Sequence, residues 1–381
     1  PDLSESEFDK QARRRGVATA LLHRLNQPES TWPLFRKKKW PHTRGYLINR
    51  IGPLGGDFSV LLSRFARETD PAVRRALMLT MGGFDWSELS KTAQSEGLLL
   101  AKDTFRNEPD VGTHSAAQWL LMQWNETKWL KEEISLQSGL ARDPRKSWFI
   151  NGEGQTMAIL DGRQDPEIGR VFAIGTGEVT VEQFQRFDPE HEYYEERSPT
   201  PDCPVGLVDW IRAARYCGWL SRELEADPDN GYPASLTANN FKVPAESVVE
   251  SGAYRLPTFA EWRFACAALT TSHRYYGYSD SLGDDYFWYY ETSLTKDRNN
   301  RYHPAGTKMP NDFGIFSTYD GVREWCTDGL RLRRFVMGYA SSGYVDRAHT
   351  RLNLPKIDEP ADLPLASNGY YGLRVAMTMS K

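Results

Sequence analysis

Residues 254–266 most constrain the fold of this chain, because they describe a strand that enters a helix. The segment begins Tyr-Arg-Leu, continues with Pro-Thr, and then places apolar residues at helical spacing. Thr258 stands where an N-terminal cap accepts a hydrogen bond from the free N–H groups of the first helical turn. The segment therefore predicts a junction of strand and helix in the C-terminal half.

Length and charge narrow the function classes. A chain of 381 residues exceeds one typical domain, so we expect two. The formal net charge of −4 gives no global field that would favour nucleic acid or membrane. No stretch approaches the ~20 apolar residues of a membrane span, and the N-terminus lacks the apolar centre of a signal peptide. We expect a cytoplasmic protein without a membrane partner.

The four cysteines are widely spaced and form no Cys-x-x-Cys pair. This pattern favours free, buried thiols in a reducing compartment over a disulfide framework. The residues are Cys203, Cys217, Cys266 and Cys326.

The N-terminal region has a helical pattern. Residues 70–81 begin with an aspartate and a proline and then place apolar residues three and four apart, which predicts a capped helix. Residues 44–52 and 113–121 carry comparable patterns, at a spacing compatible with helix pairs of ~30–40 residues. Stacked pairs bury a core that none could bury alone, so we predict an α-helical, HEAT-like repeat domain over residues 1–146.

The helical pattern ends near residue 147. Pro144 and the Asn-Gly-Glu-Gly turn at 151–154 interrupt it, and short β-like runs with many aromatic residues follow from Thr156. We therefore predict a second domain over residues 147–381 and an α+β fold class for the whole chain.

Further blocks follow one another in an order that matches a known family. Together with the Arg-Leu-Pro-Thr segment, they resemble the formylglycine-generating-enzyme, or sulfatase-modifying-factor, family over residues 148–378. The resemblance implies a C-type-lectin-like fold with a small antiparallel sheet, two helices and much irregular loop. The helical region also resembles those joined to such domains in bacterial signalling proteins. The blocks lie at residues 172–184, 202–205, 209–221, 310–316, 324–326 and 371–376.

The same blocks also contain tryptophans and charged residues that we expect to lie in the core rather than to take part in function. Trp210, Trp219, Trp262 and Trp325 stand at element junctions and are expected to pack in the core. Glu178, Glu261 and Arg374 are expected to form pairs there or to hold loop backbone, since a buried charge needs a partner.

The residues on which the family's oxidative chemistry depends are missing from this sequence. The oxidase branch of the family binds copper(I) through two cysteines near the C-terminal end, and residues 336–349 contain none. The iron-dependent sulfoxide synthases use a His-x3-His-x-Glu pattern, which this chain lacks. We expect no catalytic residues and a member of the non-catalytic branch. The histidines are His23, His42, His114, His191, His273, His303 and His349.

Calcium is the metal that the resemblance leaves open. In the family, oxygens just before and within the Glu-Trp pair can hold the ion, and a hard cation needs six to eight of them. Here a serine replaces the usual acidic or amide side chain, although a nearby aspartate could compensate. The corresponding positions are Ser317, Asp320, Val322 and Glu324. The prediction is no cofactor, with calcium as the one possible exception.

A recognition surface is predicted near the C-terminal end, where the family usually has its ligand face. Tyrosine gives large contact area at low entropy cost, and arginine and asparagine give directional hydrogen bonds. We expect a protein or peptide partner there. The residues are Tyr339, Tyr344, Asp346, Arg347, His349, Arg351, Asn353, Asn368 and Tyr370.

Two basic runs, at residues 13–15 and 36–39, raise the question of nucleic acid. Without interleaved stacking aromatics or a known motif, solvated faces or scaffold contacts are the favoured interpretation.

The sequence therefore predicts a non-catalytic recognition module of a bacterial signalling or defence system. One alternative is a metal-dependent oxidase with a non-standard site. Another is a regulatory fragment released from a larger protein, since the chain begins at Pro1 rather than Met. The oligomeric state stays open.

Overall fold

The computed structural model describes residues 4–38, 40–224, 231–233, 236–237, 245–272, 274–277, 279–288, 301–327, 334–337 and 370–379. The chain divides into two compact units. The helical unit comprises Pro1–Glu133, Ala267–Tyr286 and Gly306–Gly314. The mixed unit comprises Ile134–Cys266, Phe287–Ala305 and Ile315–Lys381.

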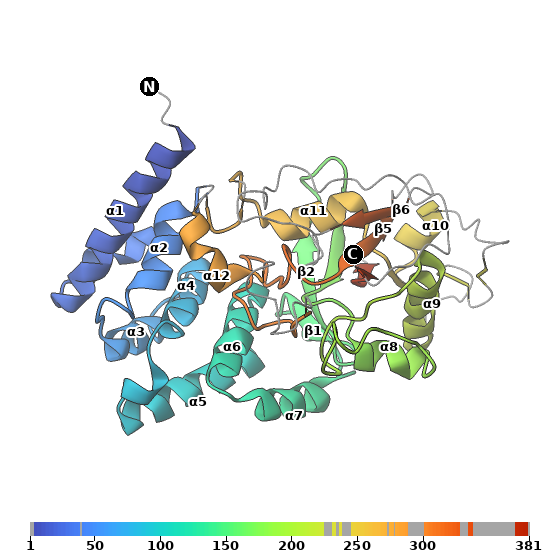
Figure 1. The fold of residues 1–381 in the computed structure, drawn as a ribbon, viewed down its shortest axis with the longest axis horizontal. Helices are drawn as coiled ribbons and strands as arrows, with labels where there is room; N and C mark the ends of the chain where they lie inside the picture. The colour runs from blue at the N-terminus through green and yellow to red at the C-terminus, as the bar shows by residue number, and fades with distance from the viewer. Residues whose placement is uncertain are drawn as a thin grey trace. The chain divides into compact units, whose positions relative to one another are not determined.

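The helical unit is formed mainly by the first seven α-helices (Figure 1). The helix predicted over residues 70–81 is confirmed as α4, where the Asp70 carboxylate accepts a hydrogen bond from the Ala72 N–H at 2.9 Å and Pro71 opens the first turn. The α-helices are α1 (Glu5–Arg24), α2 (His42–Arg50), α3 (Phe58–Phe65), α4 (Pro71–Met81), α5 (Lys91–Asn107), α6 (Val111–Gln123) and α7 (Thr127–Gln137). Short 3-10 turns are η1 (Pro28–Ser30), η2 (Trp32–Leu34) and η3 (Trp86–Glu88).

Apolar side chains from successive helices form the core of this unit. Leu47 of α2, Leu77 of α4, Phe105 of α5 and Leu120 of α6 are fully buried. Burial of one such side chain contributes about 1.5–3 kcal/mol, so each helix is held by its apolar face rather than by intrinsic propensity. The region is helical as predicted, and its HEAT-like repeat character stays a prediction.

Two later segments of the chain pack with these helices. The first includes η6 (Asp280–Leu282) and α12 (Gly283–Tyr286), and the second is Gly306–Gly314. Tyr46 of α2 donates a hydrogen bond to Ser279 at 2.8 Å, and Tyr275 donates one to the Met309 carbonyl at 2.8 Å. The seam predicted between residues 146 and 147 stays a prediction.

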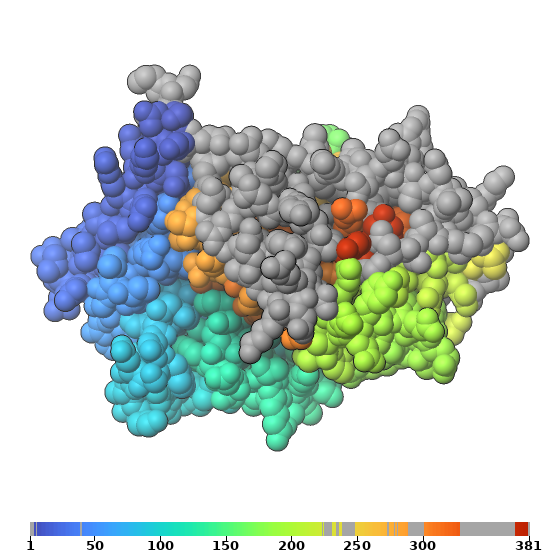
Figure 2. Space-filling model, viewed as in Figure 1, coloured from blue at the N-terminus to red at the C-terminus, as the bar shows by residue number. Residues whose placement is uncertain are grey.

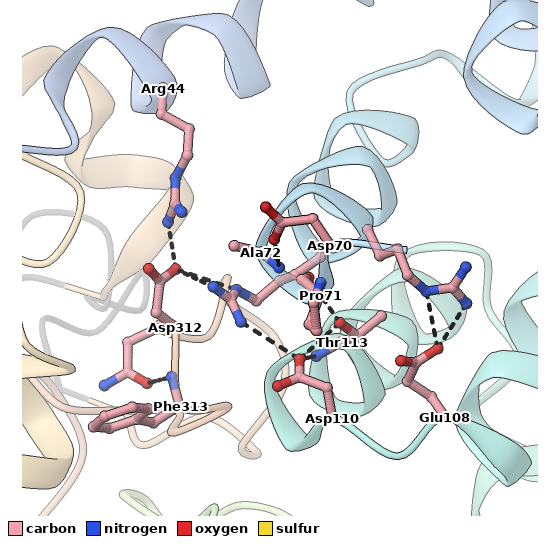
Figure 3. A network of polar contacts seen from close by, with 12 residues as sticks. Arg44, Asp70, Pro71, Ala72, Glu108, Asp110, Thr113, Asp312 and Phe313 are labelled. Atoms are coloured by element: carbon pink, nitrogen blue, oxygen red, sulfur yellow. Dashed lines mark hydrogen bonds and ion pairs between the residues drawn. The ribbon is translucent and has the colours of Figure 1, made fainter. Parts of the chain in front are cut away.

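Asp312 anchors the second of these segments (Figure 3). Its carboxylate pairs with Arg44 of α2 and with Arg75 of α4, whose Nη2 lies 3.1 Å from Oδ1. Arg75 also reaches Asp110, the cap of α6, at 3.5 Å. Burial alone would raise the pKa of Asp312, but Arg44 and Arg75 outweigh it and hold that pKa well below its ordinary value.

The mixed unit contains two small sheets. The first has the order β1-β2-β3-β8-β4 and is antiparallel throughout, and the second has the order β6-β5-β7, with β5 and β7 parallel. The strands are β1 (Trp148–Ile150), β2 (Thr156–Asp161), β3 (Val171–Gly175), β4 (Tyr254–Arg255), β5 (Arg323–Thr327), β6 (Arg334–Met337), β7 (Tyr371–Gly372) and β8 (Ala376–Thr378). The helices are α8 (Val181–Phe187), α9 (Trp210–Leu220), η4 (Ser221–Glu223), α10 (Ala245–Glu250) and α11 (Phe259–Ala267).

The predicted strand-to-helix junction is confirmed as β4 and α11. Thr258 and Glu261 cap each other reciprocally, because the Glu261 N–H donates to Thr258 Oγ1 at 3.1 Å and the Thr258 N–H donates to Glu261 Oε2 at 2.9 Å. Trp210, Trp262 and Trp325 are buried as expected, and Trp219 packs partly buried against the same core. The α+β fold class is likewise confirmed.

The last of the matching blocks, residues 371–376, does not form a single strand. It is divided into β7 and β8, which belong to different sheets. Arg374 lies between these two strands and is buried, and its guanidinium bonds the Glu324 carboxylate of β5. Among the described residues, no helix has the length and apolar character that crossing a membrane requires.

The charge on Asp312 is predicted to be essential to the helical unit. Asp312→Asn leaves Arg44 and Arg75 buried without their shared counter-ion, and the free energy of unfolding should fall by about 3–5 kcal/mol. Urea denaturation at pH 7 measures the change. Asp161→Asn is the matched control, because Asp161 forms an exposed pair with Arg163, and its midpoint should stay unchanged.

The same interaction fixes the sign of a pH effect. Since the folded-state pKa of Asp312 is lowered, its contribution is fully present above the unfolded pKa of about 3.9 and is lost as the pH falls below it. The difference in stability between wild type and Asp312→Asn should therefore shrink at acid pH. An unchanged difference would contradict this assignment.

Candidate functional site

The segments that the sequence singled out for function are held by a buried ion pair in the mixed unit. Arg374, between β7 and β8, bonds Glu324 of β5 through Nη2 to Oε1 at 2.9 Å and through Nε to Oε2 at 3.0 Å. Trp262 of α11 donates its indole N–H to Glu324 Oε2 at 2.7 Å. Both charged side chains are about 99% buried, so the pair is part of the core.

The four predicted calcium positions lie on one turn, residues 317–324, and take different roles. Glu324 is the partner of Arg374 and Trp262. Asp320 is buried and accepts a hydrogen bond from the Trp288 N–H at 2.6 Å. The Val322 N–H donates to Glu178 Oε1 at 2.8 Å, and Ser317 has a positive φ of 54°.

Glu178 lies directly beneath this turn. A Cβ atom built on Gly321 would lie 2.0 Å from Glu178 Oε1, and Gly321 has a φ of +76°, so only glycine fits there. Burial, and then the nearby Glu324 carboxylate, raise the pKa of Glu178 well above its ordinary value, while Arg374 opposes them. Oε2 of Glu178 is buried and has no hydrogen-bond partner within the described residues.

This geometry bears on the predicted calcium site. A calcium ion needs six to eight oxygen ligands, but both oxygens of Glu324 already accept hydrogen bonds from a guanidinium or an indole. If Glu324 bound a metal ion instead, the buried Arg374 would lose its counter-ion. Glu324 therefore fits a buried ion pair better than a calcium cage, and calcium binding by this segment stays a prediction.

Of the predicted recognition residues, Tyr370 is the one that the structure describes. Its hydroxyl accepts a hydrogen bond from Arg197 Nη2 at 2.9 Å, and the guanidinium carbon lies 4.1 Å from its ring centre. Arg197 also lies 5.5 Å from the ring of Tyr194, which is 51% exposed. Tyr339, Tyr344, Asp346, Arg347, His349, Arg351, Asn353 and Asn368 lie outside the described residues.

Tyr194, Arg197 and Tyr370 thus form a tyrosine–arginine cluster that the sequence did not reveal. The signal was present as Tyr-Tyr-Glu-Glu-Arg at residues 193–197, the same combination of residue types as the predicted C-terminal set. Arg197 and Tyr370 are far apart in the sequence, so their contact could not be predicted from it. Planar arginine stacked on tyrosine can accept aromatic or polar groups of a partner.

The four cysteines are free and buried, as predicted. Burial raises the pKa of each thiol, so the reactive thiolate is scarce at neutral pH. Within the described part of the chain, no three or more His, Cys, Asp and Glu residues are grouped to hold a metal ion. His23, His114 and His191 are buried and bond Thr31 Oγ1, the Phe105 carbonyl and the Gly206 carbonyl.

Comparisons with known proteins agree with this framework. Residues 124–378 match the model of the FGE-sulfatase family, described as a sulfatase-modifying factor enzyme 1-like domain. A relative, the chaperone protein LppX of Paenibacillus barcinonensis, is 30% identical over 177 residues, which cover 41% of this chain and 61% of LppX. The chain therefore spans less than two thirds of that relative.

Two solved structures are similar at lower identity. The Treponema denticola variable protein 1 has a TM-score of 0.45 and 22% identity, and the match covers 59% of this chain and 95% of that protein. PvdO from Pseudomonas aeruginosa has a TM-score of 0.43 and 17% identity, over 63% of this chain and 100% of PvdO.

Two glycines with positive φ give a matched test of the turn over Glu178. In Gly169→Ala the new Cβ meets nothing within 4 Å, so the change should cost only the left-handed backbone strain of about 1–2 kcal/mol. In Gly321→Ala the same strain is joined by a clash with the Glu178 carboxylate. We expect a loss of about 4 kcal/mol or more in chemical denaturation. Equal losses in the two variants would contradict the geometry of the turn.

Proposed function

Since this chain belongs to the sulfatase-modifying factor enzyme 1-like family, we propose that it is a non-catalytic member that recognises a protein or peptide. The C-terminal segment and the tyrosine–arginine cluster supply the recognition surface. The setting we propose is a bacterial signalling or defence system.

The observation that carries this proposal is the placement of the cysteines. An oxidase of the formylglycine-generating type needs accessible thiols that bind a soft metal ion and react with a substrate cysteine. Here all four thiols lie in the core with raised pKa values, and residues 336–349 contain no cysteine. The acidic and basic residues of the framework are similarly engaged, as in Arg374 with Glu324 and Arg255 with Glu261.

The chemistry of the cluster supports recognition. Tyr194 is half exposed, and the Arg197 guanidinium contacts the rings of both Tyr194 and Tyr370. Rigid aromatic and arginine side chains are the residues that most often dominate binding energy at interfaces. The name of the LppX relative, a chaperone protein, describes a role that also depends on binding another protein.

Metal analysis separates this proposal from the rival oxidase. We expect the purified chain to contain no stoichiometric copper or iron, and to leave the mass of a cysteine-containing peptide unchanged in the presence of copper(I) and oxygen. Because both oxygens of Glu324 accept hydrogen bonds from Arg374 or Trp262, added calcium should not raise the midpoint of thermal unfolding. Oxidation of the peptide with stable copper binding would refute the non-catalytic assignment, whereas bound calcium alone would not.

Capture of partners from the native organism tests the recognition surface. Proteins retained by the wild-type chain should be lost with Tyr194→Ala, and with Tyr339, Tyr344 and Arg347 changed together to alanine. Leu140→Ala is the control, because Leu140 is 63% exposed and belongs to neither set. If these variants keep the same partners, the proposed face is wrong.

A further inference from the structure

A second surface carries a concentration of charge that the recognition proposal does not use. Between residues 10 and 38 there are eight basic residues and one acidic residue, Glu29. The basic residues are Lys10, Arg13, Arg14, Arg15, Arg24, Arg36, Lys37 and Lys38. This local excess contrasts with the net charge of −4 for the whole chain.

All eight basic side chains are exposed, and the described part of the chain gives none of them a salt bridge. Lys37 is set apart from the other seven, since its ammonium lies 4.7 Å from the ring centre of Phe313, next to Asp312. Arg44 and Arg75, in the same helical unit, are by contrast buried and paired with Asp312. Unpaired like charges repel one another and attract polyanions, so such a surface gains free energy when an extended anion binds.

Trp40 directly follows the second basic run in the sequence and adds an exposed aromatic ring to it. Its ring is 50% exposed. Phe8 of α1 approaches it at 5.9 Å between ring centres, and His42 of α2 lies nearly parallel to it at 6.2 Å with an interplanar angle of 26°. The indole is therefore supported by two rings of the protein while half of its surface faces solvent.

Helix geometry places Arg15 on the face of α1 that carries Phe8, the residue that contacts Trp40. Phe8 and Arg15 are seven residues apart, so they lie on the same helix face about 10.5 Å from each other along the axis. Ala12 and Ala20 lie on the buried face, and Gly16 packs so closely on α2 that an added Cβ would lie 2.6 Å from Tyr46 Cβ. Arg14 and Arg15 thus face solvent, and Figure 2 shows the surface of α1 exposed along its length.

We propose that Arg14, Arg15, Arg36, Lys38 and Trp40 form a binding site for single-stranded nucleic acid. The cations contact backbone phosphates, and a base stacks on the exposed part of Trp40. This basic–aromatic patch shares no residue with the proposed recognition surface. The sequence favoured solvated faces because the aromatic partners come from separate elements, Phe8 on α1 and His42 on α2.

Single strands are favoured over other polyanions by the exposed indole. In a duplex the base faces are covered by their neighbours, so Trp40 would have nothing to stack on. An acidic peptide would use the cations but not the flat ring. An anionic lipid surface would need a broad apolar face on α1, but Ala12 and Ala20 are buried, and Leu21, 38% exposed, does not make such a face by itself.

Fluorescence anisotropy of labelled oligo-dT and oligo-U of about 12 nucleotides tests the site, a length within the range that single-strand modules cover. Wild type should bind at low salt, and Trp40→Ala should weaken binding about tenfold, whereas Trp40→Phe should stay close to wild type. Arg36→Ala with Lys38→Ala should lower the slope of log affinity against log salt by about 1.4, since each phosphate contact contributes about 0.7.

Arg142→Ala with Arg215→Ala is the charge-matched control, because both arginines are exposed and lie outside the patch. This variant should bind like wild type, and circular dichroism should show that every variant is folded. A preference between DNA and RNA would identify the source of the strand, and either preference supports the proposal. Absence of binding overturns the proposal. It is also overturned if duplex DNA, heparin or anionic vesicles bind as well as the single strands and Trp40→Ala has no effect on binding.

Discussion

The guanidinium of Arg374 determines how the mixed unit is assembled. It bonds the Glu324 carboxylate, the carbonyl of Gly175 at the end of β3, and the carbonyl of Phe316 just before the 317–324 turn. Burying an ion costs several kcal/mol, and this cost is offset only when every donor has a well-placed acceptor. Arg374 thus links the first sheet, the second sheet and the 317–324 turn. These three parts must adopt their positions together for all of its donors to be bonded.

Arg255 and Glu261 repeat this arrangement at the start of α11. The two side chains are fully buried, form two hydrogen bonds of 2.7 Å, and receive further contacts from Thr258 and Arg170. Arg255 and Glu261, like Arg374 and Glu324, are thus paired with each other in the core. The side chains on which our two proposals rest, Tyr194 and Trp40, are instead about half exposed.

Local features of the fold could be predicted from the sequence because they depend on neighbouring residues. The cap at Thr258, the helix that begins after Asp70, and the burial of Trp325 follow from propensity and hydrophobic spacing. Contacts between distant segments could not be predicted in this way. Asp312 with Arg75, Glu178 with Val322, and Arg197 with Tyr370 are each more than 140 residues apart, and no local period encodes them.

Substitutions at buried ion pairs and at exposed residues differ in their cost to stability. For this reason, family membership indicates the fold of this chain more strongly than its chemistry. Removing one member of the Arg374–Glu324 pair leaves a buried charge, so the pair can change only if both residues change together. An exposed residue carries no such penalty, and substitutions there usually alter stability by about 0.5 kcal/mol or less. Exposed positions can therefore change at little cost in stability, whereas a change at either member of the buried pair is strongly destabilising.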